Sequence, residues 1–262
     1  MKSISANLTD KQWEFIEKII EPQERRRKHS LREIINGLMY MPITGCQWRL
    51  LPGHFAPWQT VYYYFRKWKL EGVLEQLTDY LVGVVRRFSG RAESPSLGII
   101  DSRSVGTSHH ADPSCKGIDG NKKVKGRKQH IVVDSLGLPL AIDVHPASVH
   151  DSKGAMGVIA KMRGKQPKLK KIIADGGYRG ELGEKVRKRF GWEFEVVLRS
   201  DNHSNEFRPA HKRWIVERSF SWLENFRRLI TDYEFLTIEE FKGALSRLPK
   251  DNRWVKLGDS LP

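Results

Sequence analysis

Cysteine is scarce in this chain of 262 residues, which contains only Cys46 and Cys115. Two cysteines cannot build a disulfide framework or a four-cysteine zinc site. Long apolar runs are missing as well: none approaches the ~20 residues that span a bilayer, and the first residues lack the apolar stretch of a signal peptide. We therefore expect a cytoplasmic protein with no membrane partner. The 39% hydrophobic content and eight tryptophans exclude a disordered chain, because they can build a core.

Acidic residues are also few in comparison with basic residues. Lys and Arg number 46 against 31 Asp and Glu, which gives a formal net charge of +15. The excess lies in four runs, at residues 25–28, 116–128, 161–171 and 185–189. One such run is typical of a solvated surface, but four runs with few acids among them favour a polyanionic partner, nucleic acid first of all. A ribosome-like or simply soluble basic protein is the alternative.

The first third of the sequence predicts short helices joined by tight turns. Thr9 can cap a first helix, and Ser30 with Glu33 resembles a capping box before a second. Two more helices are expected at about 57–68 and 73–88, followed by a linker at 89–95. Helices arranged in this way suit a helix-turn-helix-like DNA-binding domain, which we place at residues 1–88.

Beyond the linker the pattern changes to strands alternating with helices. Apolar runs predict strands at 97–105, 130–134, 138–145 and 193–199, and a further strand at 171–178 that ends in a Gly turn. Helices are predicted from a capping Asp151, over about 181–190, and as one long helix over 213–230. A hairpin meander followed by alternating helices and strands predicts an α/β sheet covered by helices.

Two carboxylates occupy similar positions in this pattern. Asp101 and Asp175 each follow an apolar run at or near the end of a strand, and open α/β sheets place their sites beyond the carboxyl ends of strands. Mg²⁺ prefers carboxylate oxygens and keeps water molecules for substrate phosphates, so the two side chains could share divalent cations. The alternative is that each Asp only caps a turn.

Glu217 is the candidate for a third carboxylate. Periodicity places it on the polar side of the 213–230 helix, together with Arg213 and Glu224. By spacing alone, Glu217 could simply be the salt-bridge partner of Arg213, four residues earlier. Glu224, about two turns further along, is the rival ligand.

Several short motifs, taken in order, resemble those of bacterial insertion-sequence transposases of the DDE type. The motifs are Gly45-Cys-Gln-Trp-Arg-Leu-Leu-Pro with Pro57-Trp-Gln-Thr-Val-Tyr, Ile100-Asp-Ser-Arg-Ser-Val, Lys122-Lys-Val-Lys-Gly-Arg-Lys-Gln-His, Asp134-Ser-Leu-Gly-Leu-Pro-Leu, Ala147-Ser-Val-His-Asp, Ala174-Asp-Gly-Gly-Tyr-Arg-Gly and Arg213-Trp-Ile-Val-Glu-Arg-Ser-Phe-Ser-Trp-Leu. The resemblance runs from about residue 8 to about residue 240. Each fragment is weak alone, but the order and spacing together are specific.

The resemblance implies an RNase H-like mixed sheet flanked by helices over residues 96–240, preceded by the small all-α domain. It also implies that Asp101, Asp175 and Glu217 form a metal-binding catalytic triad. The cofactor would be Mg²⁺, with Mn²⁺ as a substitute. The implied reaction is hydrolysis at the end of the element, after which the freed 3′-hydroxyl attacks a target phosphodiester.

Double-stranded DNA is the implied partner: terminal inverted repeats and target DNA, bound by a homodimer. Next to the sheet hairpin lie the side chains expected to contact phosphates, which are Lys122, Lys123, Lys125, Arg127 and Lys128. Arg213 resembles the Arg of the family's Tyr-Arg-Glu-Lys signature and should lie near Glu217 and the DNA backbone.

The sequence departs from the family in three places. Ala210 replaces the signature Tyr, Glu224 replaces its Lys, and residues 241–262 form a divergent polar tail. A non-catalytic DNA-binding protein derived from a transposase therefore remains an alternative. Another RNase H-like nuclease, such as a resolvase, is a second alternative.

Overall fold

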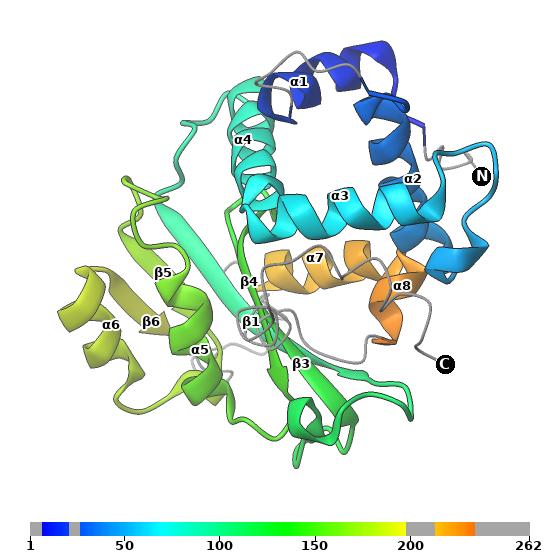
Figure 1. Ribbon diagram of the computed structural model, residues 1–262. Coiled ribbons are helices and arrows are strands. Elements are labelled where there is room, and N and C mark those ends of the chain that lie inside the picture. The colour runs from blue at the N-terminus through cyan, green and yellow to red at the C-terminus, as the bar shows by residue number, and fades with distance from the viewer. Residues whose placement is uncertain (1–6, 21–26, 198–212, 234–262) are drawn as a thin grey trace.

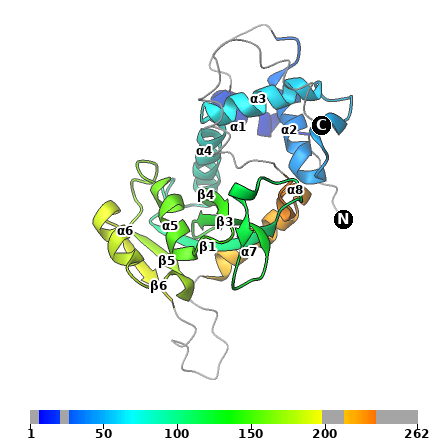
Figure 2. The same ribbon diagram turned by 60° about the horizontal axis from the view of Figure 1, so that its bottom comes forward.

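The computed structural model describes residues 7–20, 27–197 and 213–233. Helices α1 to α3 stand apart from a mixed β-sheet, and α4 leads from them to the sheet, as Figure 2 shows. The structure therefore confirms the predicted order of an all-helical region followed by an α/β region. Among the described residues, no helix is long and apolar enough to cross a membrane.

Local capping signals fix the N-terminal helices, which are α1 (Asp10–Ile20), α2 (Leu31–Thr44), α3 (Trp58–Leu70) and α4 (Val73–Phe88). The amide of Gln12 donates to Thr9 Oγ1 (3.3 Å), as a helix cap requires. Ser30 and Glu33 form the predicted capping box at the start of α2. Gly45 ends α2 with φ of 70°, a conformation that glycine adopts without strain.

The sheet contains the strands β1 (Leu97–Gly106), β2 (Gly117–Ile118), β3 (Lys125–Val133), β4 (Pro139–Pro146), β5 (Lys171–Ala174) and β6 (Glu193–Val196). Strands β4, β3 and β1 are antiparallel neighbours, and β5 and β6 continue parallel to β1. The short strand β2 pairs with the start of β3. The resulting order, β4-β3-β1-β5-β6, is that of an RNase H-like sheet and confirms the expected fold.

Helices cover both faces of the sheet (Figure 1). On one face, α5 (Asp151–Ala160) and α6 (Leu182–Phe190) share a core with Ile100 of β1 and Val132 of β3. On the other face, α7 (Trp214–Glu224) packs on Ile99 and Ile131. Successive side chains of a strand point to opposite faces, which is why neighbouring residues of β1 belong to different cores.

Helix α4 belongs to both regions. Its N-terminal half packs against the core of the helical region, whereas Val82 lies in the core beneath α5 and α6. Arg86 forms a buried ion pair with Asp134, which opens the turn between β3 and β4. The predicted 89–95 linker is held against α4, because Arg86 Nε donates to the carbonyl of Ala92 (2.6 Å).

Several predicted bounds were wrong. The helix expected over 213–230 is two helices, because the extended backbone of Phe226 (φ −100°, ψ 104°) separates α7 from α8 (Arg227–Ile230). Strand β3 begins at Lys125, five residues earlier than expected. The N-cap of α5 is His150, whose ring accepts from the amide of Ser152, so Asp151 is the first helical residue. The divergent tail at 241–262 and Ala210 lie outside the described residues.

Candidate active site

Asp101 and Asp175 come from neighbouring parallel strands. Strands β1 and β5 pair in a register that joins Ile99 to Ile173. The same register, extended by two residues, brings Asp101 opposite Asp175, which directly follows β5. Asp101 itself lies in the middle of β1 and not near the end of the strand, as the sequence had predicted. We call these two side chains the carboxylate pair.

The two negative charges act on each other. Burial, and less strongly the charge of Asp175, raise the pKa of Asp101 to about 6, while Lys122 and Arg213 oppose that rise. The amide of Ser102 donates to Asp101 Oδ1 (2.7 Å), which also favours the charged form. Two neighbouring carboxylates that repel each other in this way form a site at which a bound cation would be stabilised.

Asp175 also has the turn role that was considered as an alternative. Its Oδ1 accepts from the amide of Gly177 (2.9 Å) and caps the 3₁₀ turn η3 (Gly176–Tyr178). Its other oxygen, Oδ2, lies 4.0 Å from a guanidinium nitrogen of Arg213. Capping therefore uses Oδ1 and leaves Oδ2 next to the guanidinium of Arg213.

Glu217 lies in the first turn of α7 and pairs with Arg213, whose Nη2 donates to Glu217 Oε1 (2.9 Å). The i,i+4 salt bridge expected from spacing is thus present. Because the same guanidinium reaches Asp175, Arg213 connects Glu217 to the carboxylate pair. Glu224 instead lies 3.7 Å from Arg103.

The side chains around the carboxylate pair suit a hard cation. Mg²⁺ and Mn²⁺ bind carboxylate oxygens and retain water. A methyl group placed on Gly177 would lie 3.1 Å from Asp175 Oδ1 and 3.6 Å from Asp151 Oδ2, so the absence of a side chain leaves a small space lined by carboxylate oxygens. Within the described ranges, no three His, Cys, Asp or Glu side chains are already close enough to enclose an ion.

Three of the predicted phosphate contacts are exposed, and two are not. Lys122, Lys123 and Lys125 are exposed, and the amine of Lys122 reaches the carbonyl of Ser102 (3.0 Å), beside Asp101. Arg127 is buried and pairs with Asp232 (2.8 Å).

Lys128 is buried as well, and its amine lies 3.0 Å from Asp151 Oδ1 and 3.4 Å from Asp119 Oδ2. The early start of β3 explains the burial of Arg127 and Lys128, because a basic run expected in a loop lies instead in a central strand. The structure therefore contradicts a phosphate contact for Arg127 and Lys128, whose charges are already paired inside the fold.

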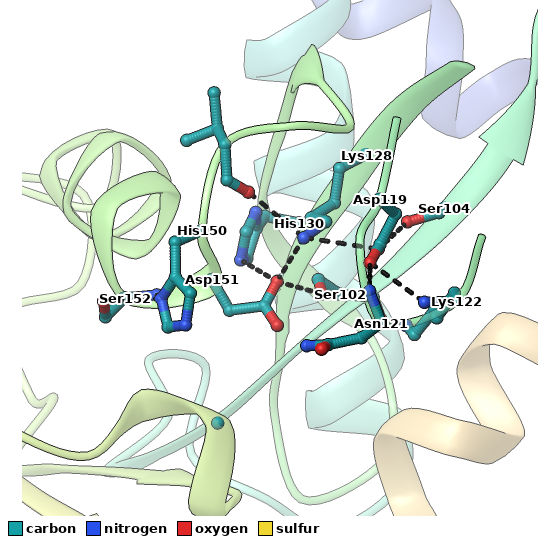
Figure 3. A network of polar contacts seen from close by, with 12 residues as sticks. Ser102, Ser104, Asp119, Asn121, Lys122, Lys128, His130, His150, Asp151 and Ser152 are labelled. Carbon is teal, nitrogen blue, oxygen red and sulfur yellow. Dashed lines mark hydrogen bonds and ion pairs between the residues drawn. The ribbon is translucent and has the colours of Figure 1, made fainter. Parts of the chain in front are cut away.

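Asp151 and Tyr178 are the site residues that sequence reasoning missed. Asp151 joins a polar network that includes Ser102 and Lys128 (Figure 3). Tyr178 is almost fully buried, and the charges of Asp101, Asp151 and Asp175 all act on its hydroxyl. Both residues stand in motifs that were quoted for the resemblance, but spacing along the chain gave no sign that they meet.

Two family models match the chain. Residues 92–242, more than half of the chain, match a family model described as "Transposase DDE domain". Residues 8–78 match one described as "Putative transposase of IS4/5 family".

A relative from Burkholderia cepacia, named "Putative transposase for insertion sequence element IS402", is 32% identical over 143 residues. The match covers 52% of this chain and 64% of the relative, so the chain spans less than two thirds of that protein. A solved piggyBac transposase synaptic complex with hairpin DNA matches at 12% identity and a TM-score of 0.30, over 58% of this chain and 34% of that one. The strand order agrees with the DDE match, and because that match covers more than half of the chain, the chain belongs to the family of transposases with a DDE domain.

Proposed function

We propose that this chain binds the ends of an insertion element, cuts DNA by metal-dependent hydrolysis and joins the freed 3′-hydroxyl to target DNA. The observation that carries the proposal is the register of β1 and β5, which brings Asp101 opposite Asp175. In this proposal Asp101, Asp175 and Glu217 hold Mg²⁺, for which Mn²⁺ can substitute.

A bound divalent cation would polarise the scissile phosphate and make water a stronger nucleophile. In the first step a water oxygen forms a bond to phosphorus, and the bond from phosphorus to the 3′-oxygen breaks, which leaves a 3′-hydroxyl and a 5′-phosphate. In the second step that hydroxyl attacks a target phosphorus and displaces the 3′-oxygen of the target strand. Asp101 and Asp175 would hold the cation, and the cation would in turn bind the negatively charged phosphate.

Arg213 has a distinct role in this proposal. Its guanidinium pairs with Glu217 and approaches Asp175, so it supplies positive charge among the carboxylates of the metal-free protein. When a cation takes over that charge, the guanidinium is free to bind a DNA phosphate, a contact for which Arg is well suited. Glu217 then becomes available as the third ligand.

The DNA itself would be held by the exposed side chains of Lys122, Lys123 and Lys125, of which Lys122 reaches the carbonyl of Ser102 beside Asp101. Bringing two element ends together requires two active sites, so we propose a homodimer on DNA. The protein would act in the bacterial cytoplasm and at the nucleoid when bound.

The test uses the full chain and a supercoiled plasmid that carries the DNA flanking its coding region. We expect Mg²⁺-dependent nicking followed by joining to a second duplex. Asp101→Asn, Asp175→Asn and Glu217→Gln should each cost more than the roughly 10–100-fold that outer-sphere partners of a metal cost. Glu224→Gln, which alters an acid of the same helix that pairs with Arg103, should keep the wild-type rate.

The outcomes also separate the alternatives. Full-rate nicking by all three carboxylate variants would contradict the proposal. DNA binding without nicking would favour a non-catalytic derivative, for which the divergent sequence of residues 241–262 is the observation in favour. Cutting without joining would favour a resolvase-like nuclease.

A further inference from the structure

Asp151 has one carboxylate oxygen that is fully engaged. Its Oδ1 accepts a hydrogen bond from Ser102 Oγ (2.8 Å) and lies 3.0 Å from the amine of Lys128 (Figure 3). Nε2 of His130 lies 3.8 Å from the same oxygen. These contacts come from β1 and β3 and fix the orientation of a side chain that begins helix α5.

The other oxygen of Asp151 lies on the side of Asp175. The point where a methyl group on Gly177 would lie is 3.6 Å from Asp151 Oδ2 and 3.1 Å from Asp175 Oδ1. Both oxygens therefore border the same small space, at the turn that follows β5. Ser102, which orients Asp151, is the residue directly after Asp101 on β1, and since successive side chains of a strand point to opposite faces, Asp101 and Asp151 approach this space from opposite sides of the sheet.

A second, independent feature points into this space. Tyr178 is 1% exposed, and its hydroxyl oxygen makes no hydrogen bond of ordinary geometry with the described part of the chain. The charges of Asp101, Asp151 and Asp175 act on this hydroxyl, and the Ser102 side chain interacts with it at a geometry short of an ordinary hydrogen bond. A buried hydroxyl with so poor a partner is costly, unless a ligand or its water completes its hydrogen bonding.

Lys128 explains why Asp151 stays ionised in this setting. Burial opposes the charge of Asp151, but hydrogen bonds from Lys128 and Ser102 outweigh it and keep its pKa below the ordinary value. Asp119, the other partner of Lys128, is buried and accepts from Ser104 Oγ (2.5 Å) as well. The amine of Lys128 is thus shared between Asp119, which is enclosed by the protein, and Asp151, whose Oδ2 remains available to the site.

We propose that Asp151 is a positioning residue of the cation site, whose Oδ2 accepts hydrogen bonds from the hydration shell of the ion held by Asp101 and Asp175. Tyr178 contributes its hydroxyl to the same shell. This inference rests on the proposed function, since it assumes that the carboxylate pair binds a divalent cation. It assigns Lys128 to holding Asp151 in place, in the position where the sequence suggested a DNA contact.

The test measures Mn²⁺ binding to the full chain without DNA, from the electron paramagnetic resonance signal of the free ion. Outer-sphere partners of a metal ligand typically contribute 10–100-fold in affinity, so Asp151→Asn should weaken Mn²⁺ binding about tenfold. The matched control is Asp119→Asn, which removes the other acid beside Lys128 and should leave Mn²⁺ affinity within about twofold. Asp101→Asn should abolish binding.

A purely structural role for Asp151 predicts different results. If Asp151 only neutralises Lys128, the double variant Asp151→Asn with Lys128→Met should recover wild-type Mn²⁺ affinity, and that recovery would overturn the inference. We expect the double variant to stay as weak as Asp151→Asn. Retained Mn²⁺ binding by Asp101→Asn would instead contradict the proposed function, so the two failures are distinguishable.

Ser102→Ala provides a test that leaves every charge in place. It removes the hydroxyl that orients Asp151 Oδ1 and should weaken Mn²⁺ binding several-fold, even if Asp151→Asn does not fold. Thermal melting in a chelator reports folding for each variant. Wild-type Mn²⁺ affinity in a folded Ser102→Ala variant would count against Asp151 as a positioning residue.

Discussion

The charged form of Asp101 lowers the stability of the folded chain. Burial and Asp175 raise its pKa from 3.8 to about 6, so the folded state holds a proton between these pH values that the unfolded state has lost. This group therefore makes stability fall as pH rises from about 4 to about 6, and the full penalty persists above pH 6. After allowance for its remaining exposure, we expect a penalty on the order of 2 kcal/mol at pH 7.5.

Asp101→Asn should remove that penalty. In a chelator at pH 7.5 the variant should have a free energy of unfolding about 2 kcal/mol higher than that of the wild type, measured by urea denaturation. When Mg²⁺ is added, the wild type should become the more stable of the two proteins, because the ion stabilises only a chain that binds it. A variant less stable than the wild type in the chelator would show that the charge of Asp101 is satisfied within the protein itself.

His130 supplies a second pH dependence, of opposite sense. Burial, with a smaller contribution from His145 at 2.7 Å, lowers its pKa from 6.5 to about 4. Below pH 6.5 the unfolded chain takes up a proton that the folded chain refuses, so stability falls as the solution is acidified from pH 6.5 to pH 4. Between pH 7.5 and pH 5 the loss from this group should be about 2 kcal/mol.

The measurement compares urea denaturation of the wild type and of His130→Gln at both pH values. The variant should be less stable than the wild type at pH 7.5 but should lose less stability on acidification, by about 2 kcal/mol. Equal losses in the two proteins would mean that the acid sensitivity comes from the carboxylates alone.

Elements marked by local signals were the ones that the sequence predicted well. Helix α4 has its predicted bounds and strand β5 begins at its predicted residue, Lys171, because apolar periodicity and flanking turns define both without help from distant residues. The break between α7 and α8 escaped prediction because it depends on tertiary packing. Arg228 of α8 donates to the carbonyl of Cys46 (2.8 Å), 182 positions away in the sequence.

The same distinction separates the site residues that were predicted from those that were missed. Asp101 and Asp175 each end an apolar run, so position along the chain was enough to select them. Whether Lys128 points to solvent or inward depends on the length of β3 and on what α5 brings next to it. Asp151 became visible as a site residue only when that packing was known.

The η3 turn is the element whose shape the proposed cation site requires most directly. A methyl group at Gly177 would lie near the oxygens of Asp175 and Asp151, within the space assigned to the ion and its water. Gly177→Ala should therefore weaken Mn²⁺ binding by roughly the 10-fold that disturbed outer-sphere contacts cost, while the melting temperature in a chelator changes little.

Gly53→Ala is the control, because a methyl group there would contact nothing within 4 Å. Gly53→Ala should alter neither the Mn²⁺ affinity nor the melting temperature in a chelator. Unchanged Mn²⁺ affinity in Gly177→Ala would place the ion elsewhere along the carboxylate pair.

At the scale of the whole molecule, the net charge of +15 is divided by burial into cations that hold the fold and cations that remain for DNA. Arg86, Arg127 and Lys128 are buried beside acids and belong to the first kind. Net charge therefore predicted a polyanionic partner, but only burial shows which side chains remain accessible to it.

The exposed lysines between β2 and the start of β3 should determine how DNA affinity depends on salt. Each phosphate contact contributes about 0.9 to the slope of log K against log salt concentration. Replacing Lys122, Lys123 and Lys125 together by Ala should make the slope shallower by about two to three, measured by fluorescence anisotropy on a labelled duplex.

The matched control removes the same charge from α6, which lies at the far edge of the sheet (Figure 1), by replacing Lys185, Arg187 and Lys188 with Ala. If DNA runs across the carboxylate pair, the control keeps most of the wild-type slope. Equal losses in the two triple variants would mean that the whole basic surface binds DNA without a preferred path.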